Sequence, residues 1–237
     1  MRGIGNMKVL FIGVGLVHYY NPVLNRLNRE PGVQVMNLVP KGSRGHLQEG
    51  VFQTREGVEF EVFELEERHC GVRHHSFKGL ARLLWRMRPD IVVVTDHYMA
   101  AFVFSLPIVM VVKALRIRVI MKSIPFRLRR YDDSLAAIGL AAGAAAGGIR
   151  QRGSRVLAAR PGLIWRRVLL EANRVMFRAA DAHVNYVDEA YDVYGSYGVP
   201  KERIFVTRNS PDTDYLLKTA AEIEGTAPIL PPCACRV

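Results

Sequence analysis

The chain has few cysteines, and its N-terminus lacks the features of a leader peptide. Its three cysteines are an odd number, and Cys233 and Cys235 have no second pair at the spacing of a zinc site. We therefore expect ordinary thiols and no bound metal. The opening residues lack the basic start, apolar stretch and small-residue cleavage site of a signal peptide. These absences favour a cytoplasmic location.

A membrane-spanning helix is not expected either. The longest apolar stretch, residues 98–112, contains Pro107 and is followed by Lys113. A span needs about 20 apolar residues, which is more than this stretch provides. We expect instead one long helix over residues 99–115 that is buried against a sheet.

Acidic residues are scarce in one part of the chain. Residues 113–178 hold 15 Lys and Arg against 3 acidic residues, a net charge of +12, whereas the rest holds 18 against 19, a net charge of −1. A basic excess confined to one segment indicates an anionic partner. Phospholipid headgroups, nucleic acid and a phosphorylated substrate all fit the charge alone.

The chain does contain a regular alternation of strand-length apolar runs and helical segments. This alternation predicts an α/β, Rossmann-like fold, a parallel sheet with helices on both faces. The clearest helical pattern is an apolar stripe over residues 165–179, preceded by an Ala/Gly-rich stretch (136–148) and a basic one (150–160). We expect strands at 8–12, 33–39, 58–65, 91–95, 119–121, 182–187 and 204–207, and helices at 21–29, 77–87 (capped by Ser76), 99–115, 165–179 and 189–197.

Ligands of such sheets bind in the crevice at the carboxyl ends of the strands. Three strand ends carry notable residues: the glycine loop 13–15, the stretch 96–98 and the stretch 122–126. We expect these stretches to lie along one edge of the sheet and to form the binding site.

The stretch from Arg178 onward resembles a segment of family-4-type GT-B glycosyltransferases. Its matching residues are Ala180-Asp181-Ala182, Gly198-Val199-Pro200, Arg203-Ile204 and Asn209 through Asp212. The runs KVLFIG and RPDIVVVTDH resemble the opening and fourth strands of the same family. The resemblance implies that residues 7–215 form the acceptor-side domain and residues 216–237 an interdomain linker or tail. It also implies that the C-terminal donor-binding domain is absent, and that sugar transfer retains the anomeric configuration without a metal.

Two positions depart from the family pattern. The Asn-Gly-x-Asp of the family is Asn209-Ser210-Pro211-Asp212 here, so the glycine turn is replaced. Many members place a histidine after the strand that corresponds to residues 119–121, and this chain has Lys122 and Ser123 there. A histidine role is therefore not carried over to that position.

Each candidate residue has a functional and a structural interpretation. Gly13, Val14 and Gly15 form an incomplete dinucleotide fingerprint, which either lets backbone N–H groups approach a phosphate or sugar hydroxyl or only makes a tight turn. His18 follows this loop and can stack, with its tyrosine neighbours, on a sugar ring or pack on a helix. His97 is the candidate general base. Lys122 either pairs with a phosphate or is solvated. The full set of other substrate-binding candidates is Asp96, Tyr98, Lys122, Ser123 and Asn209.

The basic segment has three interpretations. Arginines beside apolar helical stretches suit an anionic membrane, at about 1 kcal/mol for each residue near the surface. Nucleic acid is disfavoured because no aromatic sheet signature or helix-turn-helix pattern accompanies the charge. A solvated arginine-rich face is the third interpretation. The candidate membrane or anion contacts are Arg127, Arg129, Arg130, Arg166 and Arg167.

The resemblance implies a hexosyl-type transferase that moves a sugar from a nucleotide-sugar, its donor substrate and not a cofactor, to a lipid-linked or glycan acceptor. We expect this chain alone to be inactive. It is expected to be cytoplasmic, and under the membrane interpretation of its basic segment it associates peripherally with the inner face of a membrane. The alternative is a stand-alone Rossmann-like module that binds nucleotides or anionic lipid. A dehydrogenase is disfavoured because the second strand ends in Val39-Pro40-Lys41, without the acid that binds the ribose.

Overall fold

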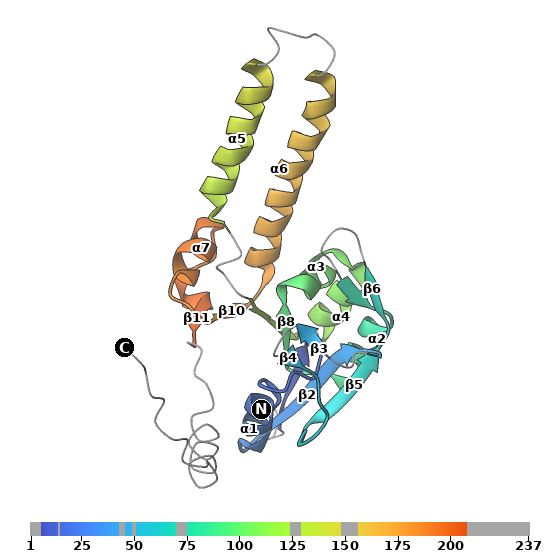
Figure 1. The fold of residues 1–237 in the computed structure, drawn as a ribbon. Helices are drawn as coiled ribbons and strands as arrows, with labels where there is room; N and C mark the ends of the chain where they lie inside the picture. The colour runs from blue at the N-terminus through green and yellow to red at the C-terminus, as the bar shows by residue number, and fades with distance from the viewer. Residues whose placement is uncertain are drawn as a thin grey trace, which may run out of the picture.

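The computed structural model describes residues 6–13, 15–42, 46–48, 51–69, 75–123, 129–147 and 156–207. Its centre is a seven-stranded parallel sheet with the order β11-β10-β9-β8-β1-β2-β5 (Figure 1). This confirms the α/β, Rossmann-like fold. The strands are β1 (Met7–Ile12), β2 (Val33–Pro40), β5 (Glu61–Leu65), β8 (Ile91–Thr95), β9 (Arg118–Lys122), β10 (Ala182–Asn185) and β11 (Ile204–Val206).

The two faces of the sheet are covered unequally. Alternate side chains of a strand point to opposite faces, so Leu10 and Ile12 belong to one face and Phe11 to the other. The first face forms the larger core, together with α2 (Leu80–Met87), α3 (Asp96–Phe104), α4 (Leu106–Leu115) and α7 (Ala190–Ser196). The second face packs against α1 (Asn21–Arg29), which alone among the described helices contributes to the smaller cluster around Leu24. Helices therefore lie on both faces, as the sequence indicates.

The apolar stretch 98–112 is not one long helix. Helices α3 and α4 meet at Ser105 with a bend of 85°. Pro107 has no backbone N–H to continue the hydrogen-bond ladder of α3, and it lies in the first turn of α4, where that N–H is not needed. The prediction of a single buried helix is therefore wrong: α3 is largely buried, whereas α4 exposes Leu106 and Met110.

A membrane span is not found among the described helices taken one at a time, because none is long and apolar enough. The α3–α4 pair passes the same test of length and composition only when its two bent halves are counted together.

The helix expected to be capped by Ser76 begins later. Residues His75–Phe77 form β7, antiparallel to β6 (Glu67–His69), and α2 starts after Gly79, whose φ is 83°. Phe77 is buried as a strand residue and stacks on Tyr98 at 4.9 Å. Glycine adopts this left-handed conformation without a Cβ clash, so Gly79 sets the helix start. A second short ribbon, β3 (His46–Gln48) and β4 (Val51–Phe52), lies in the β2–β5 connection.

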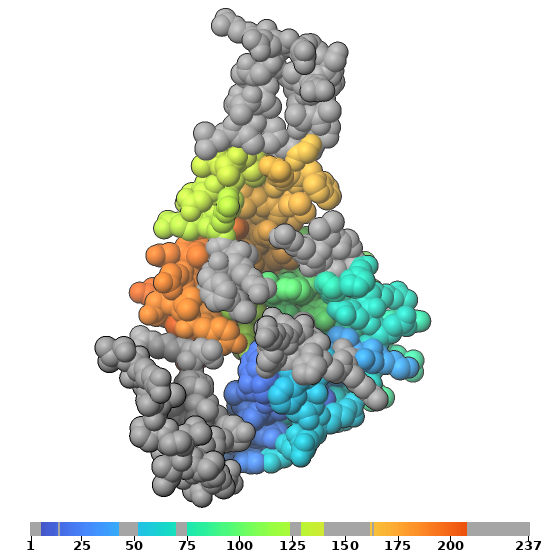
Figure 2. Space-filling model, in the orientation of Figure 1, coloured from blue at the N-terminus to red at the C-terminus, as the bar shows by residue number. Residues whose placement is uncertain are grey.

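Helices α5 (Tyr131–Gly147) and α6 (Val156–Ala179) form a hairpin between β9 and β10 that projects from the body (Figures 1 and 2). The Ala/Gly-rich stretch is thus helical, in keeping with the high helix propensity of alanine, and α6 begins nine residues before Trp165. The base is held by Tyr131, whose hydroxyl donates to Glu171 and whose ring lies 5.0 Å from Arg174.

The block from Ala180 to Ile204 makes the strand–helix–strand unit β10–α7–β11. Gly198 ends the α7 segment with φ 83°, and Pro200 precedes a single 3-10 turn (Lys201–Arg203) that leads into β11. Asp181 accepts a hydrogen bond from the Val119 N–H at 2.8 Å and one from Arg118 at 3.1 Å. Asp181 therefore joins the starts of two neighbouring strands, which is a structural role.

We expect Asp181→Ala to destabilise the fold by about 1–2 kcal/mol, because the substitution leaves the Val119 N–H without its acceptor. Asp181→Asn retains an acceptor oxygen and should recover most of this loss. Urea denaturation of the three proteins at pH 7 measures the difference. Equal stability of the Ala variant and the unmodified chain would contradict the structural role.

Candidate functional site

The chain segments that the sequence marks as candidates lie at the carboxyl edge of the sheet. The glycine loop follows β1, Asp96 follows β8, Ser123 follows β9 and Tyr186 follows β10. These strands are neighbours in the sheet, so their ends lie along one edge. The expectation that the three strand ends share an edge is confirmed.

Lys122 is the distinctive residue of this edge. Its Nζ lies 3.5 Å from the centre of the Tyr20 ring and 5.5 Å from the centre of the Tyr186 ring. An ammonium over an aromatic face is stabilised by the ring quadrupole. Burial lowers the pKa of Lys122 from 10.5 to about 8, because desolvation disfavours the charged form. Burial also raises the pKa of Tyr20, with Tyr186 and Tyr19 adding to the effect.

No acidic side chain forms an ion pair with Lys122 among the residues that the structure describes. Beside it in the register of β8 and β9 stands Thr95. The Thr95 hydroxyl is buried without a hydrogen-bond partner in the described part of the chain. A half-buried cation and a buried, unpaired hydroxyl on adjacent strand ends make a polar group suited to an anion.

The glycine loop is only partly available to a ligand. The Gly13 N–H already donates to the Leu38 carbonyl oxygen at 3.2 Å, so it cannot donate to a phosphate without leaving β2. The Gln53 side chain lies directly over Gly15, where any Cβ would displace it. At Gly13 a Cβ would meet only the Gly15 oxygen, at 4.0 Å. Gly15 thus allows a close approach, and Gly13 borders open space.

His18 is held by the β3–β4 ribbon. Its ring stacks on Phe52 with centroids 4.0 Å apart, and its Nδ1 lies 3.3 Å from the Phe52 carbonyl oxygen and 3.4 Å from the Phe52 nitrogen. Only one of these contacts is a hydrogen bond for a given tautomer. One ring face is therefore occupied by Phe52, which leaves less of the imidazole for stacking on a sugar.

Asp96 and His97 form a hydrogen-bonded pair at the first turn of α3. His97 Nδ1 lies 2.7 Å from Asp96 Oδ1, and the two side chains are 49% and 43% exposed. An Nδ1–H that donates to a carboxylate leaves Nε2 as the acceptor, which is the tautomer that a general base needs. The pair is accessible to a ligand at this edge.

The β6–β7 ribbon places further histidines close to His97. His75 lies 6.1 Å from His97 and 4.5 Å from His69, measured between ring centroids. His75 Nδ1 is 2.8 Å from Glu67 Oε1, close enough for an ion pair although the angle is not that of a hydrogen bond. The neighbouring His74 and Cys70 lie outside the described residues. Within the described residues no group of three or more His, Cys, Asp or Glu has the geometry of a metal site.

Two of the predicted substrate-binding residues are interior. Tyr98 is 1% exposed, and its hydroxyl donates to Glu67 at 2.8 Å. Ser123 is 5% exposed and contacts Asn185 and the Tyr194 hydroxyl. Tyr98 points into the core because each residue of α3 is rotated by about 100° from the one before it, which turns Tyr98 away from the side of Asp96. Ser123 is buried because it directly follows β9 and contacts Asn185 of β10 and Tyr194 of α7. Both side chains pack in the interior, and their contact with a substrate stays a prediction.

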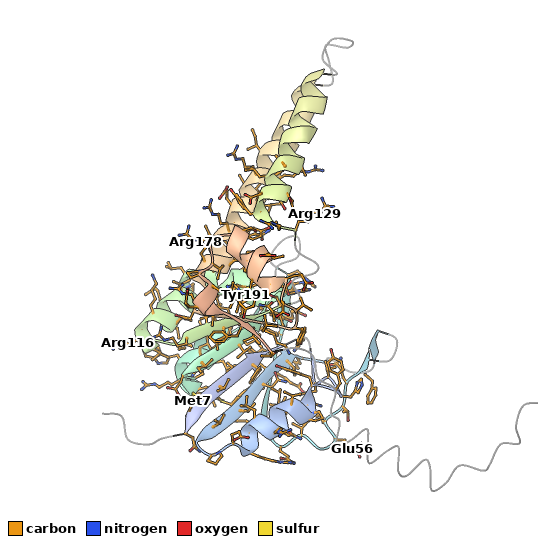
Figure 3. All side chains as sticks on the ribbon, turned by 90° about the vertical axis from the view of Figure 1, so that its left-hand side faces the viewer. Met7, Glu56, Arg116, Arg129, Arg178 and Tyr191 are labelled. Atoms are coloured by element: carbon orange, nitrogen blue, oxygen red, sulfur yellow. The ribbon has the colours of Figure 1, made fainter. Side chains whose placement is uncertain are left out.

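The remaining predicted residues fall into two sets. Arg129, Arg130, Arg166 and Arg167 are exposed on the α5–α6 hairpin or at its base; Arg129 is labelled in Figure 3. Val14, Arg127 and Asn209 lie outside the described residues. The opposite edge of the sheet holds an open hollow of about 420 Å³, lined by residues of the 88–90 and 114–116 turns. It contains none of the candidate residues.

No family model matches the chain, and a search of curated proteins gave no match. Among solved structures, the chain is similar to a UDP-glucosyltransferase from Polygonum tinctorium, capable of glucosylating indoxyl and solved with 3,4-dichloroaniline. The TM-score is 0.37 at 10% sequence identity, and the alignment covers 97% of this chain and 56% of the other. The chain thus spans little more than half of that protein, and a likeness of this size bears on neither family nor activity.

Proposed function

We propose that this chain is the acceptor-side domain of a glycosyltransferase, resembling family 4, whose substrates are a nucleotide-sugar donor and a lipid-linked or glycan acceptor. The observation that carries the proposal is the Lys122 ammonium, half-buried between two tyrosine rings at the carboxyl edge of the sheet. A desolvated cation without a carboxylate partner is stabilised when an anion binds. The diphosphate of a nucleotide-sugar or of a lipid-linked acceptor supplies such an anion.

The Asp96–His97 pair supplies the second part of the proposal. In the transfer step the acceptor oxygen bonds to the anomeric carbon, the bond from that carbon to the donor phosphate breaks, and the acceptor hydroxyl loses its proton. His97 accepts or orients this proton through Nε2, while Asp96 holds the ring. Lys122 holds a phosphate of one of the two substrates. No metal is needed for these roles.

The described residues form one main sheet, whose carboxyl edge would be one wall of the proposed substrate cleft. Transfer requires the donor and acceptor to be held together in the reactive geometry. We therefore propose that the 237-residue chain binds its anionic substrate weakly and does not catalyse transfer by itself. The alternative function, a stand-alone nucleotide- or lipid-binding module, shares the Lys122 site but needs no base at His97.

Titration of the ¹⁵N-labelled chain with UDP-glucose and, separately, with geranyl diphosphate tests the proposal. We expect one or both ligands to shift the amide signals of Gly15, Thr95 and Lys122, and not those of Arg88 and Arg116 at the opposite edge. The arm with the larger shifts identifies the donor or the acceptor as the source of the phosphate. Incubation with UDP-glucose and acceptor should release no UDP above the blank.

Three outcomes separate the possibilities. Shifts confined to the opposite edge, or no shift with either diphosphate, refute the site. Release of UDP by the chain alone would refute the proposal that the isolated chain is inactive. It would not refute the proposed function in sugar transfer. If UDP-glucose shifts the amide signal of Lys122 but leaves that of His97 unchanged, the stand-alone binding module is favoured.

A further inference from the structure

Helix α6 carries a row of apolar side chains on its outer surface. Ile164, Val168, Ala172, Val175 and Ala179 follow one another at steps of four, four, three and four residues. At about 3.6 residues per turn this spacing places them in one line, roughly 22 Å long. Ile164, Val168 and Val175 are 66%, 49% and 51% exposed. We call these five residues the outer row.

The outer row borders the part of α6 that packs in the core. The buried residues among those described in this helix are Leu170, Met176 and Phe177, together with Ala180 just after it. Leu170 is rotated by about 200° from Val168 around the helix axis, whereas Met176 is rotated by only about 40° from Ala172. An amphipathic surface helix ordinarily buries its apolar stripe. The apolar surface of α6 is wider than the side that packs against the body, and most of the outer row stays exposed.

Two further apolar side chains widen the outer row. Trp165 and Leu169 are 62% and 39% exposed and lie along one edge of it. Contiguous exposed apolar surface of this kind marks an interaction site more often than a solvated face. The hairpin stands clear of the body in two perpendicular views, so a flat partner can reach it (Figures 1 and 3).

The charges around the outer row are almost all positive. Residues 164–180 contain four arginines and one glutamate, a net charge of +3. Arg167 and Arg178 are exposed and lie along the edge opposite Trp165; Arg178 is labelled at the base of the hairpin in Figure 3. Glu171, the one acid, accepts from the Tyr131 hydroxyl and lies 3.8 Å from Arg174. Its charge is thus engaged within the hairpin.

We propose that the outer row of α6 docks side-on against an anionic lipid surface, with Trp165 at the headgroup level and Arg167 and Arg178 paired with lipid phosphates. The inference is independent of the proposed function. An interfacial helix has this arrangement of a wide apolar face with arginines beside it, and tryptophan favours the boundary between apolar and aqueous layers. A second copy of the chain fits less well, because facing outer rows would bring the arginines of both copies together.

Vesicle co-sedimentation of the full chain tests this. Binding should be strong to vesicles with 30% phosphatidylglycerol and weak to phosphatidylcholine alone, at low ionic strength. The double variant Val168→Glu/Val175→Glu should bind at least tenfold less. Val23→Glu is the matched control, because Val23 is 55% exposed on α1, away from the hairpin. Neutralising Arg167 or Arg178 to glutamine should weaken binding about fivefold each.

Trp165 gives a readout that needs no destabilising change. In a Trp85→Phe background it is the sole tryptophan, and its emission should shift to the blue with anionic vesicles. The proposal is overturned if the double variant and the control bind alike, or if Trp165 emission is unchanged by vesicles that retain the protein. It is also overturned if the outer row proves to hold a dimer, seen as a halving of mass by light scattering in the double variant.

Discussion

We expect the Lys122→Met variant to be more stable than the unmodified chain at pH 7 and to have lost most of its affinity for pyrophosphate. The two effects have one cause, the partial burial of an ammonium between Tyr20 and Tyr186. A pKa lowered from 10.5 to about 8 corresponds to roughly 3 kcal/mol against the charged form. Contact with the Tyr20 ring offsets part of this, so we expect a net gain of about 1–2 kcal/mol.

The stability gained by the Lys122→Met substitution decreases as the pH rises. Because the pKa of Lys122 is lower in the folded chain, the unfolded chain binds more protons between about pH 8 and the unfolded value near 10.5. The penalty is fully present below pH 8 and is relieved as the pH rises through that window. The stability of the unmodified chain should therefore approach that of the methionine variant at high pH, as measured by urea denaturation at pH 7, 9 and 10.5.

Loss of the charge removes a charge-assisted hydrogen bond to the ligand, about 1.5–3 kcal/mol or roughly ten- to hundredfold in affinity. Isothermal titration with pyrophosphate at pH 7 measures it. Lys201→Met is the matched control, since Lys201 lies 5.3 Å from the Tyr191 ring but is exposed. Unchanged affinity in the Lys122 variant, or an equal loss in the Lys201 variant, would remove Lys122 from the binding site.

Leu10→Ala should destabilise the fold by about 2–5 kcal/mol, the range for a fully buried leucine that leaves a cavity. Leu10 is 0% exposed in β1, the strand that pairs with both β2 and β8. Its neighbours in the larger core come from several helices and strands, so the cavity cannot collapse without moving the sheet.

The same substitution at Leu106 provides the contrast. Leu106 is 70% exposed where α3 meets α4, and Leu106→Ala should change the free energy of unfolding by less than about 0.5 kcal/mol. Chemical denaturation of both variants gives the comparison. A large loss at Leu106 would mean that the surface at the bend is covered in solution.

The sheet could be predicted from the sequence because each of its central strands is a continuous apolar run. Residues 8–12, 91–95 and 119–121 are almost entirely apolar, with buried and half-buried side chains along each strand, and such strands stand out in any α/β sequence. The β6–β7 ribbon could not be predicted, because its residues, such as Glu67 and His75, are polar and have no alternation. The bend at Ser105 was missed although Pro107 marks it, since uniform apolarity on both sides conceals a change of direction.

The candidate site was predictable only in its position. Strand ends identify the edge, but not which way each side chain points. Asp96 and His97 face outward whereas the adjacent Tyr98 is buried, a difference set by the exact residue at which α3 begins. The environment of Lys122 was unpredictable for another reason. Its partners Tyr20 and Tyr186 are distant in the sequence: Tyr186 follows β10, Tyr20 lies between β1 and α1, and the strand order β10-β9-β8-β1 brings the three together.

The hairpin of α5 and α6 leaves the sheet after β9 and returns at β10, which is the next strand in space. Both of its ends are therefore anchored at adjacent points, where the first turns of α5 and the last turns of α6 pack against the core. Related proteins can lengthen or shorten the outer part of this hairpin without altering the register of any strand, as insertions at anchored surface segments generally do. The reach of the molecule toward a surface can thus evolve independently of the chemistry at the edge of its sheet.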